Sequence, residues 1–530
     1  MKKIYLMLAL VAGVLTSCDM DKEPYGVLPD KGTFLAPSNF VEARAGLYVS
    51  LRGCVGGETN YVAPELQCEN FNAVSGFSNT LSTMYCWEFT TDDGVFSGMY
   101  GSAQGTITRC NFIIDGYNST DFSNTKLWNP NPQPDYGEDK TDLGLLAAKK
   151  AKGDAFFTRA YALFMLAQYF CDAYDPATAD QPNTGASYTL SYAPTVTPDK
   201  YPGRNTLKQT YQQIYDDLDS ASVYVTATPQ ANNPYISVDA ITALRARVAL
   251  AQGNYELARD EAALLIESGT YTLCSSPSDL TAMYTYDGVN LGAGGATGSS
   301  EAIFQLISAS TNELPSATGT RFLPYQDGAV PDYIPTRNFV DLFANNDYRR
   351  SVYFEQKYVM TTAGAGGTVY VFNKYPDHGF LYQYTNGSEA SRFNHMPTVF
   401  RIAEMYLIAA EASTMMGDLD EGQRYLEELQ ENRFESYEAP DLSTKEKLMT
   451  EIQNERTREL ACEGFHLIDL KRWHKGFSRG IPQQRDLCSL PGASTTDMVV
   501  AADDPRLTWP IPKHEMNVNK QIVQNKGYTK

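Results

Sequence analysis

Four glutamates recur at four-residue intervals near the end of this 530-residue chain, and this ladder constrains the fold more than any other feature. They are Glu451, Glu455, Glu459 and Glu463. Residues four apart stack on one face of a helix, where like charges repel by about 0.2–0.5 kcal/mol per pair. The ladder therefore predicts one helix through all four glutamates, faced by arginines from other segments. The expected structural ion network comprises Arg401, Glu455, Arg456, Glu459, Glu463 and Arg472.

Stacked carboxylates have a second interpretation, as an acid/base pair or a metal site. Buried ion networks crowd charges in the same way without doing chemistry, and this simpler interpretation is favoured. We expect neither a metal nor a catalytic residue at the ladder.

The ladder also forms part of a longer motif. It reads Ile452-x-x-Glu455-Arg456-x-x-Glu459-Leu460-x-x-Glu463-Gly464, followed by Asp469-Leu470-x-Arg472-Trp473. A closing motif consists of Pro510-Ile511-Pro512-x-x-Glu515 and Gln524-Asn525-Lys526-Gly527-Tyr528. Both resemble the C-terminal region of SusD/RagB-type outer-membrane lipoproteins, and Arg159-Ala160-Tyr161 resembles the first long helix of that family. One position departs from the family pattern, because His466 stands where arginine is usual.

The resemblance implies a mainly α fold, a discontinuous tetratricopeptide-like scaffold of helical pairs with long loop-rich insertions and a few short strands. It also implies a surface protein of Bacteroidetes that binds oligosaccharide nutrients and delivers them to a TonB-dependent transporter of the SusC kind. A RagB-like peptide-binding subunit is the alternative ligand class. Two other classes of protein stay open: a surface glycan hydrolase, and an interaction scaffold whose helical groove holds a partner chain.

The beginning of the chain predicts a lipid anchor. Met1-Lys2-Lys3 and the apolar stretch 4–14 are typical of a secretory signal, and the stretch is too short to span a bilayer. Leu15-Thr16-Ser17-Cys18 then reads as a lipobox, which predicts cleavage after residue 17 and acylation of Cys18. Several acyl chains hold a protein stably on a membrane. The expected location is the outer membrane, with the protein facing the cell exterior.

Charge and cysteine spacing exclude several classes of function. The net charge of −20 argues against nucleic acid as a partner. The eight cysteines after Cys18 contain no Cys-x-x-Cys pair, which argues against zinc, and their spacing leaves disulfide pairing open. We therefore expect no cofactor apart from the acyl lipid, and nothing in the sequence supports calcium.

The pattern along the chain predicts a tether over residues 18–38 and a single domain over 39–530. Its scaffold should cover about 39–271 and 397–530, and a glycine- and tyrosine-rich insertion should cover about 272–396. Predicted helices cover 39–51, 104–115, 154–170, 207–223, 238–268 and 399–432. Glycines at 253 and 417 predict tight turns between antiparallel helices. Ser443-x-x-Glu446 predicts a capping box before the glutamate ladder.

Ligand-binding residues are expected on loops carried by this scaffold. Aromatic rings can stack on the flat faces of sugars, while carboxylates and guanidinium groups can bind their hydroxyls. The candidates from segment 55–100 are Tyr85, Trp87, Asp92 and Asp93. Those from the insertion are Tyr284, Tyr286, Arg321, Tyr325 and Tyr333.

Catalytic motifs lack their required context. Gly476-Phe477-Ser478-Arg479-Gly480 matches a nucleophile elbow, but that motif needs a strand before the serine and a helix after it. Here the preceding segment is expected to be helical and Pro482 follows closely. We expect a binding protein and not an enzyme; Asp92 or Asp93 would supply the acids of the hydrolase alternative.

Overall fold

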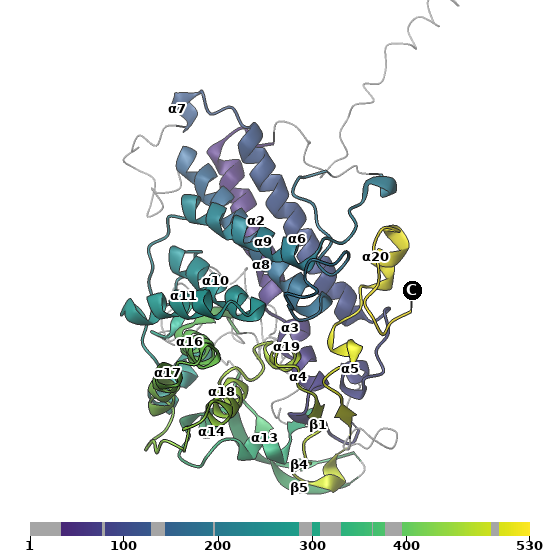
Figure 1. The fold of residues 1–530 in the computed structure, drawn as a ribbon, viewed down its shortest axis with the longest axis vertical. Helices are drawn as coiled ribbons and strands as arrows, with labels where there is room; N and C mark the ends of the chain where they lie inside the picture. Colours follow the sequence, from purple (N-terminus) through teal and green to yellow (C-terminus); the bar gives the residue numbers. More distant parts are fainter. Residues whose placement is uncertain are drawn as a thin grey trace, which may run out of the picture.

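The computed structural model describes residues 33–76, 80–128, 144–193, 197–285, 299–307, 330–362, 364–376, 395–488 and 498–529 (Figure 1). Most of this part of the chain is helical, and its strands are short. They form four antiparallel two-stranded sheets: β1–β3, β2–β6, β4–β5 and β7–β8. The mainly α class predicted from the sequence is confirmed. Within the described ranges, none of the helices combines the length and apolar character needed to cross a bilayer.

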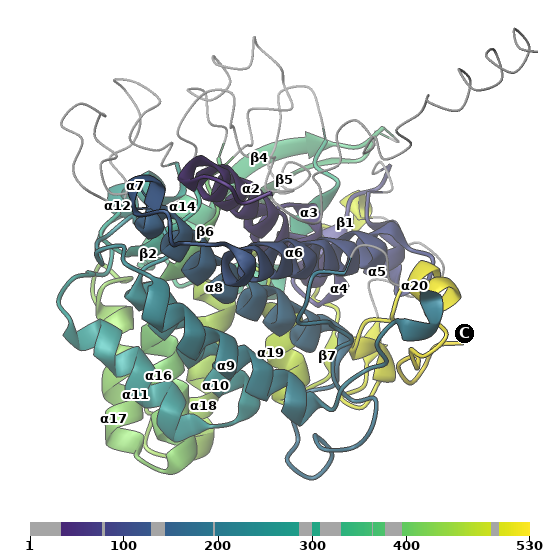
Figure 2. The same ribbon diagram turned by 90° about the horizontal axis from the view of Figure 1, so that it is seen from above.

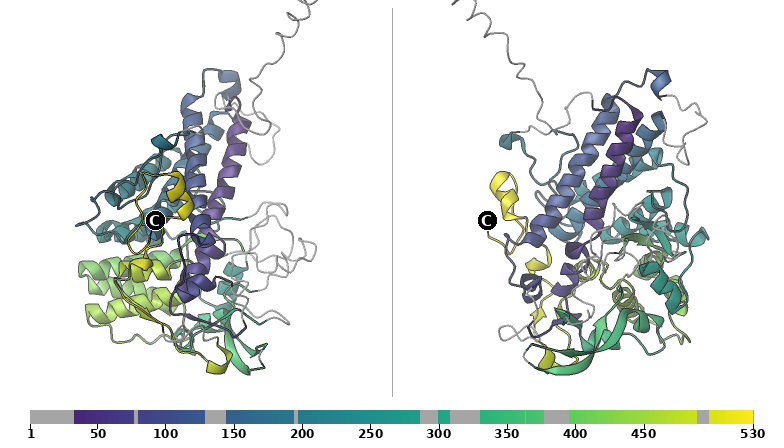
Figure 3. Two further views of the ribbon diagram at one scale, coloured as in Figure 1. Left: turned by 90° about the vertical axis from the view of Figure 1, so that its right-hand side faces the viewer. Right: turned by 180° about the vertical axis from the view of Figure 1, so that it is seen from behind.

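Four long helices pack side by side in one half of the molecule (Figures 1 and 3). They are α2 (Pro37–Val55), α6 (Gly94–Ser119), α8 (Leu145–Phe170) and α9 (Leu207–Tyr224). Helix α8 lies at the centre of this group, because it contacts the other three. Gly153 lets α8 approach the end of α9 closely: a Cβ there would lie 2.9 Å from the backbone nitrogen of Val225.

Two helical pairs extend the scaffold (Figure 2). They are α10 (Val238–Gln252) with α11 (Tyr255–Glu267), and α16 (Ile402–Met416) with α17 (Leu419–Glu431). Each pair turns at a glycine with positive φ, +77° at Gly253 and +94° at Gly417. The next residue, Asn254 or Asp418, then caps the second helix through its side-chain oxygen. Helices α11 and α16 pack together, so segments about 150 residues apart share one core.

Helix α18 (Lys445–Glu459) differs from its prediction at both ends. It begins after Thr444, whose Oγ1 accepts a hydrogen bond from the Lys447 amide at 3.3 Å, so the capping residue predicted at Ser443 is wrong by one position. It ends at Glu459 because the chain turns through positive φ at Cys462 and Gly464. Glu463 therefore lies beyond the helix, and the prediction of one helix through all four glutamates is wrong.

The insertion is more regular than its composition suggested. Its described part contains helices α12, α13 and α14 and the β4–β5 hairpin. These elements pack on a second apolar cluster, separate from the main core, near the lower end of Figure 1. The bounds are α12 Pro277–Tyr284, β2 Ala302–Gln305, β3 Tyr333–Pro335, α13 Arg337–Asp341, α14 Tyr348–Tyr353, β4 Phe354–Met360, β5 Gly366–Phe372 and β6 Thr398–Arg401.

Short elements complete the described fold. Segment 55–100 is not purely loop, since it holds three short helices and one strand. The bounds are α3 Glu58–Tyr61, α4 Ala63–Gln67, β1 Phe71–Ala73, α5 Ser82–Cys86, α7 Thr125–Trp128, α19 His466–Arg472, β7 Phe477–Ser478, β8 Val499–Val500 and α20 Lys513–Val518. Helix α4 contacts α19, which brings residues about 400 positions apart together.

Candidate functional site

Three guanidinium groups surround the carboxylate of Glu459, which is fully buried. Arg433 donates to Oε1 and Oε2, each at 2.9 Å, and Arg349 donates to Oε2 at 2.7 Å. Arg401 donates to Oε1 as well. Burial opposes ionisation of Glu459, but the three positive charges outweigh it and hold its pKa well below the usual range.

The other glutamates extend this network in both directions. Glu455 accepts from Arg349 and, at 2.6 Å, from Arg458. Glu463 accepts from Lys374 at 2.6 Å and from Arg401. The cations come from α14, the residues that follow β5, β6, the residues that follow α17, and α18 itself. The network therefore ties the insertion to the scaffold.

Arg456 and Arg472 belong to a second cluster, not to the network around Glu459. Both donate through Nε to Asp469, each at 2.8 Å. Arg472 also donates to Glu411 on α16, at 2.7 Å through Nη2. The half-buried Trp473 donates its indole N–H to the same carboxylate at 2.9 Å. The single network expected from the sequence is two.

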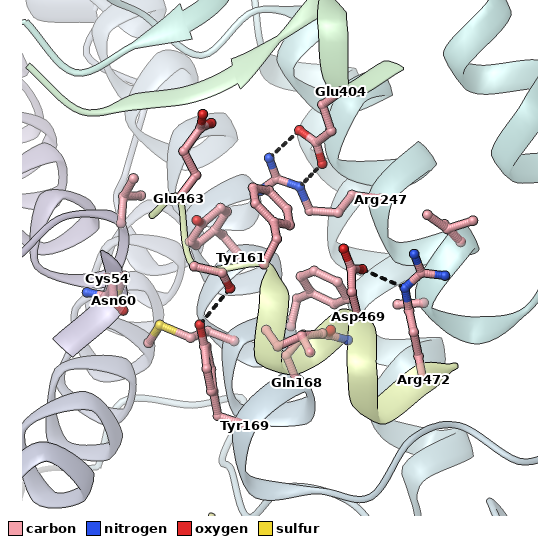
Figure 4. Close-up of a pocket in the computed structure, with 18 of the residues that line it drawn as sticks. Cys54, Asn60, Tyr161, Gln168, Tyr169, Arg247, Glu404, Glu463, Asp469 and Arg472 are labelled. Atoms are coloured by element: carbon pink, nitrogen blue, oxygen red, sulfur yellow. Dashed lines mark hydrogen bonds and ion pairs between the residues drawn. The ribbon is translucent and has the colours of Figure 1, made fainter. Parts of the chain in front are cut away.

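A small cavity of about 80 Å³ lies beside this second cluster (Figure 4). Arg247 spans the two carboxylate oxygens of Glu404 at 2.6 Å each, and Tyr169 donates to the carbonyl of Gly464 at 3.0 Å. Ligand pockets usually enclose roughly 300–1,000 Å³. The cavity therefore has room for water-sized molecules and not for a sugar chain.

Four of the predicted ligand-binding aromatic residues lie in the interior. Tyr85 and Tyr333 are fully buried with ring centroids 5.3 Å apart, and Tyr333 donates to the carbonyl of Thr80. Trp87 is buried and donates its indole N–H to the Gln67 carbonyl at 2.7 Å. The prediction that these rings face a ligand is wrong. Residues 85–87 and strand β3 pack on the apolar clusters and do not form open loops.

Tyr284 is buried for the same reason. Its hydroxyl shares a hydrogen bond of 2.9 Å with the hydroxyl of Tyr353, and the ammonium group of Lys374 lies 5.0 Å from its ring centroid. The ring supports the ion network and presents no face to a ligand.

The two candidate acids lie at the start of α6 and already have partners. Asp92 is exposed and pairs with Lys513 at 2.7 Å. Asp93 accepts from the Thr83 hydroxyl at 2.8 Å and from the Thr90 amide at 2.7 Å. These contacts assign Asp93 to the turn that precedes the helix.

Four other predicted residues, Cys18, Tyr286, Arg321 and Tyr325, lie outside the described residues. Their roles stay predictions. The eight cysteines from Cys54 to Cys488 are free thiols, so the structure resolves the pairing that their spacing left open.

An open groove that the sequence did not indicate lies between α2 and α6, with a volume of about 670 Å³. We call it the α2–α6 groove. Its wall carries Phe34, Phe112 and Tyr192, with Phe112 centred 5.0 Å from each of the other two rings. Glycines inside the two helices could have indicated the groove, because a glycine there destabilises a helix by roughly 0.5–1 kcal/mol relative to alanine. A Cβ at Gly46 or Gly105 would meet no atom within 4 Å.

Comparison with known families gives two matches. Residues 358–528 match the SusD family. Residues 70–250 match a family described as starch-binding and associating with the outer membrane. A comparison with curated proteins gives no match.

Solved structures share the fold over nearly the whole chain. A SusD superfamily protein from Bacteroides thetaiotaomicron is 23% identical, with a TM-score of 0.70, covering 92% of this chain and 99% of its own. A SusD superfamily protein from Bacteroides vulgatus is 22% identical, with a TM-score of 0.68 and coverage of 93% and 100%. A SusD-like carbohydrate binding protein from Bacteroides vulgatus is 16% identical, with a TM-score of 0.68 and coverage of 93% and 98%. At these identities the likeness establishes the fold.

Proposed function

We propose that this chain, which belongs to the SusD/RagB family, binds oligosaccharides at the cell surface and delivers them to a TonB-dependent transporter of the SusC kind. The observation that carries the proposal is the pair of family matches, one in each half of the chain. The family matched by residues 70–250 is described as starch-binding and as associating with the outer membrane. Binding is noncovalent, with no turnover.

The ion network around Glu459 supports a structural role for this part of the molecule, with the ligand surface formed by other residues. The ion network around Glu459 holds α14, β6 and α18 together, and its charged groups are buried and paired. They are therefore not available to bind hydroxyls. Arg321, Tyr286 and Tyr325 stay our ligand-binding candidates in the insertion, and the α2–α6 groove adds Phe112 and Tyr192.

The test is a binding screen of the purified full chain against a panel of plant, host and starch-like glycans, by calorimetry, with products analysed by chromatography. We expect binding without product. Tyr325→Ala or Arg321→Ala should weaken it at least tenfold if the insertion forms the site, whereas Tyr192→Ala should do so if the groove forms it. Tyr358→Ala is the matched control, because Tyr358 is an exposed aromatic residue on β4, with 63% of its surface accessible.

Other outcomes would change the assignment. Binding to peptides and to no glycan would favour the RagB-like alternative. Release of shorter glycans would favour a hydrolase, and Asp92→Asn and Asp93→Asn would then be examined for loss of product.

The anchor and the transporter are tested separately. Cys18→Ala should move the protein from the membrane fraction to the soluble fraction, because acylation supplies the membrane affinity. The acylated chain should copurify from outer membranes with a TonB-dependent transporter. Membrane retention of Cys18→Ala would contradict the predicted lipidation.

A further inference from the structure

A compact group of metal-ligating side chains lies where α4 meets α19, away from the ladder of glutamates. The Cys68 thiol, a Glu69 carboxylate oxygen and a His466 ring nitrogen all lie within 4.8 Å of one another. His466 Nε2 is 3.0 Å from Glu69 Oε1. Cys68 is fully buried and His466 is nearly so. The three residue types supply sulfur, nitrogen and oxygen, the donor set that zinc takes in proteins.

Several polar atoms in this group lack a well-aligned hydrogen bond among the described residues. They are Oε2 of Glu69 and both carboxylate oxygens of Glu65, which is fully buried, whereas Nε2 of His466 has only its contact with Glu69. Glu65 lies three and four residues before Cys68 and Glu69, and its charge acts directly on His466. The backbone amide of Cys462 lies close enough to lower the pKa of Glu65, but it is not aligned for a hydrogen bond to either carboxylate oxygen. Buried polar groups in folded proteins nearly always have partners, so this concentration of carboxylate oxygens without hydrogen bonds points to a ligand.

The charges in the group are consistent with a divalent cation. Thiolate Cys68, Glu69 and Glu65 would contribute three negative charges, and the neighbouring Arg479 contributes one positive charge. A divalent ion with neutral His466 would make the group neutral. Arg479 itself is directed elsewhere, because it donates to the carbonyls of Leu66 and Tyr85.

The distances require only small movements. Zinc–ligand bonds of about 2.0–2.3 Å in a tetrahedron place the ligand atoms roughly 3.3–3.8 Å apart. The three ligand atoms are now up to 4.8 Å apart. Side-chain rotations that shorten these separations by about 1 Å would bring the atoms to the tetrahedral distances. The Cys68 thiol would give up its contact of 3.2 Å with the Pro64 carbonyl and lose its proton, because the thiolate is the ligand. The Glu69 side chain is 27% exposed, which leaves a route for the ion.

We propose that Cys68, Glu69 and His466 bind one transition-metal cation of the Zn²⁺ class, with the negative charge of the neighbouring Glu65 favouring the cation. The ion would join α4 to α19 across about 400 residues of chain. This site is independent of the glycan surface. It depends on an imidazole at position 466, where the SusD/RagB resemblance leads one to expect arginine; a guanidinium group would pair with Glu69 but would not ligate a metal.

The test measures metal binding by the purified full chain after treatment with a chelator. Zn²⁺ should bind at one equivalent and raise the melting temperature. Co²⁺ in its place should give a thiolate-to-cobalt charge-transfer band, which reports sulfur ligation and does not depend on any variant. Absence of a bound equivalent of Zn²⁺, or a Co²⁺ spectrum without that band, would overturn the proposal.

Variants locate the site. Cys68→Ser and His466→Arg should each weaken Zn²⁺ binding at least tenfold, and His466→Arg should keep its fold because the new charge faces Glu69. Cys110→Ser is the matched control, since Cys110 is a buried free thiol on α6, far from this group in the sequence. Equal loss of affinity in Cys110→Ser and Cys68→Ser, or unchanged affinity in His466→Arg, would contradict the assignment.

Discussion

Glu459 and Glu65 are both fully buried glutamates, yet their surroundings shift their pKa values in opposite directions. Burial opposes ionisation of both carboxyls. Three guanidinium groups hold the pKa of Glu459 well below its usual range, whereas burial raises the pKa of Glu65 to about 7. The charge state of a buried carboxyl in this fold is thus decided by the cations that distant segments bring to it.

The largest effect should come from Glu459→Gln. Removing one partner from a buried ion network leaves uncompensated charge and costs about 3–5 kcal/mol in the free energy of unfolding. Urea unfolding followed by circular dichroism at pH 7 would measure it. A decrease in the free energy of unfolding of under about 1 kcal/mol would show that Arg349, Arg401 and Arg433 do not need this carboxylate. It would contradict the contrast drawn between Glu459 and Glu65.

Acid should weaken the same network. Burial opposes ionisation of Glu455, but Arg349 and Arg458 lower its pKa to about 2. A carboxyl with a lowered folded-state pKa contributes stability above its unfolded pKa and loses it as pH falls toward the folded value. Glu455 alone should therefore contribute on the order of 3 kcal/mol at pH 6, lost between about pH 4.5 and 2. Melting temperatures over this range should fall less steeply in Glu455→Gln than in the parent protein; equal slopes would contradict this.

Glu65→Gln should have a much smaller effect in metal-free protein at pH 7. Because Glu65 accepts no hydrogen bond from a guanidinium group among the described residues, the amide removes a charge that its site stabilises poorly, and the change should be within about 1 kcal/mol. The same urea experiment with chelator present measures it. A cost as large as that of Glu459→Gln would mean that Glu65 is strongly paired, and the contrast would fail.

The smallest effect should come from Arg424→Ala. Arg424 pairs with Glu428 at 2.7 Å on the surface of α17, with both side chains more than a third exposed. Exposed pairs four residues apart contribute about 0.3–0.5 kcal/mol. This variant calibrates the comparison, since a cost of several kcal/mol would show that charge removal anywhere destabilises the protein.

Local patterns predicted the helical pairs well and the surroundings of single side chains poorly. The turns predicted at Gly253 and Gly417 both form, and the structure adds a helix cap after each, at Asn254 and Asp418. The predicted helix 104–115 is shorter than α6, because glycines, which disfavour a helix, interrupt its first turns, although Phe96, Met99, Tyr100 and Ala103 lie there at helical spacing. Tyr85 and Trp87 lie in a segment of loop-like composition, and only the packed structure shows that the second cluster and the main core bury them.

The sequence by itself determined the helical-pair scaffold, the family and the need for cations opposite the glutamate ladder. These properties follow from spacings within one or two helical turns, which any folded context must respect. Only the tertiary structure decided that Arg349, Arg401 and Arg433 meet at Glu459, and that His466 meets Cys68 and Glu69. Contacts between segments tens to hundreds of residues apart depend on how the whole core packs, and no local pattern records that packing.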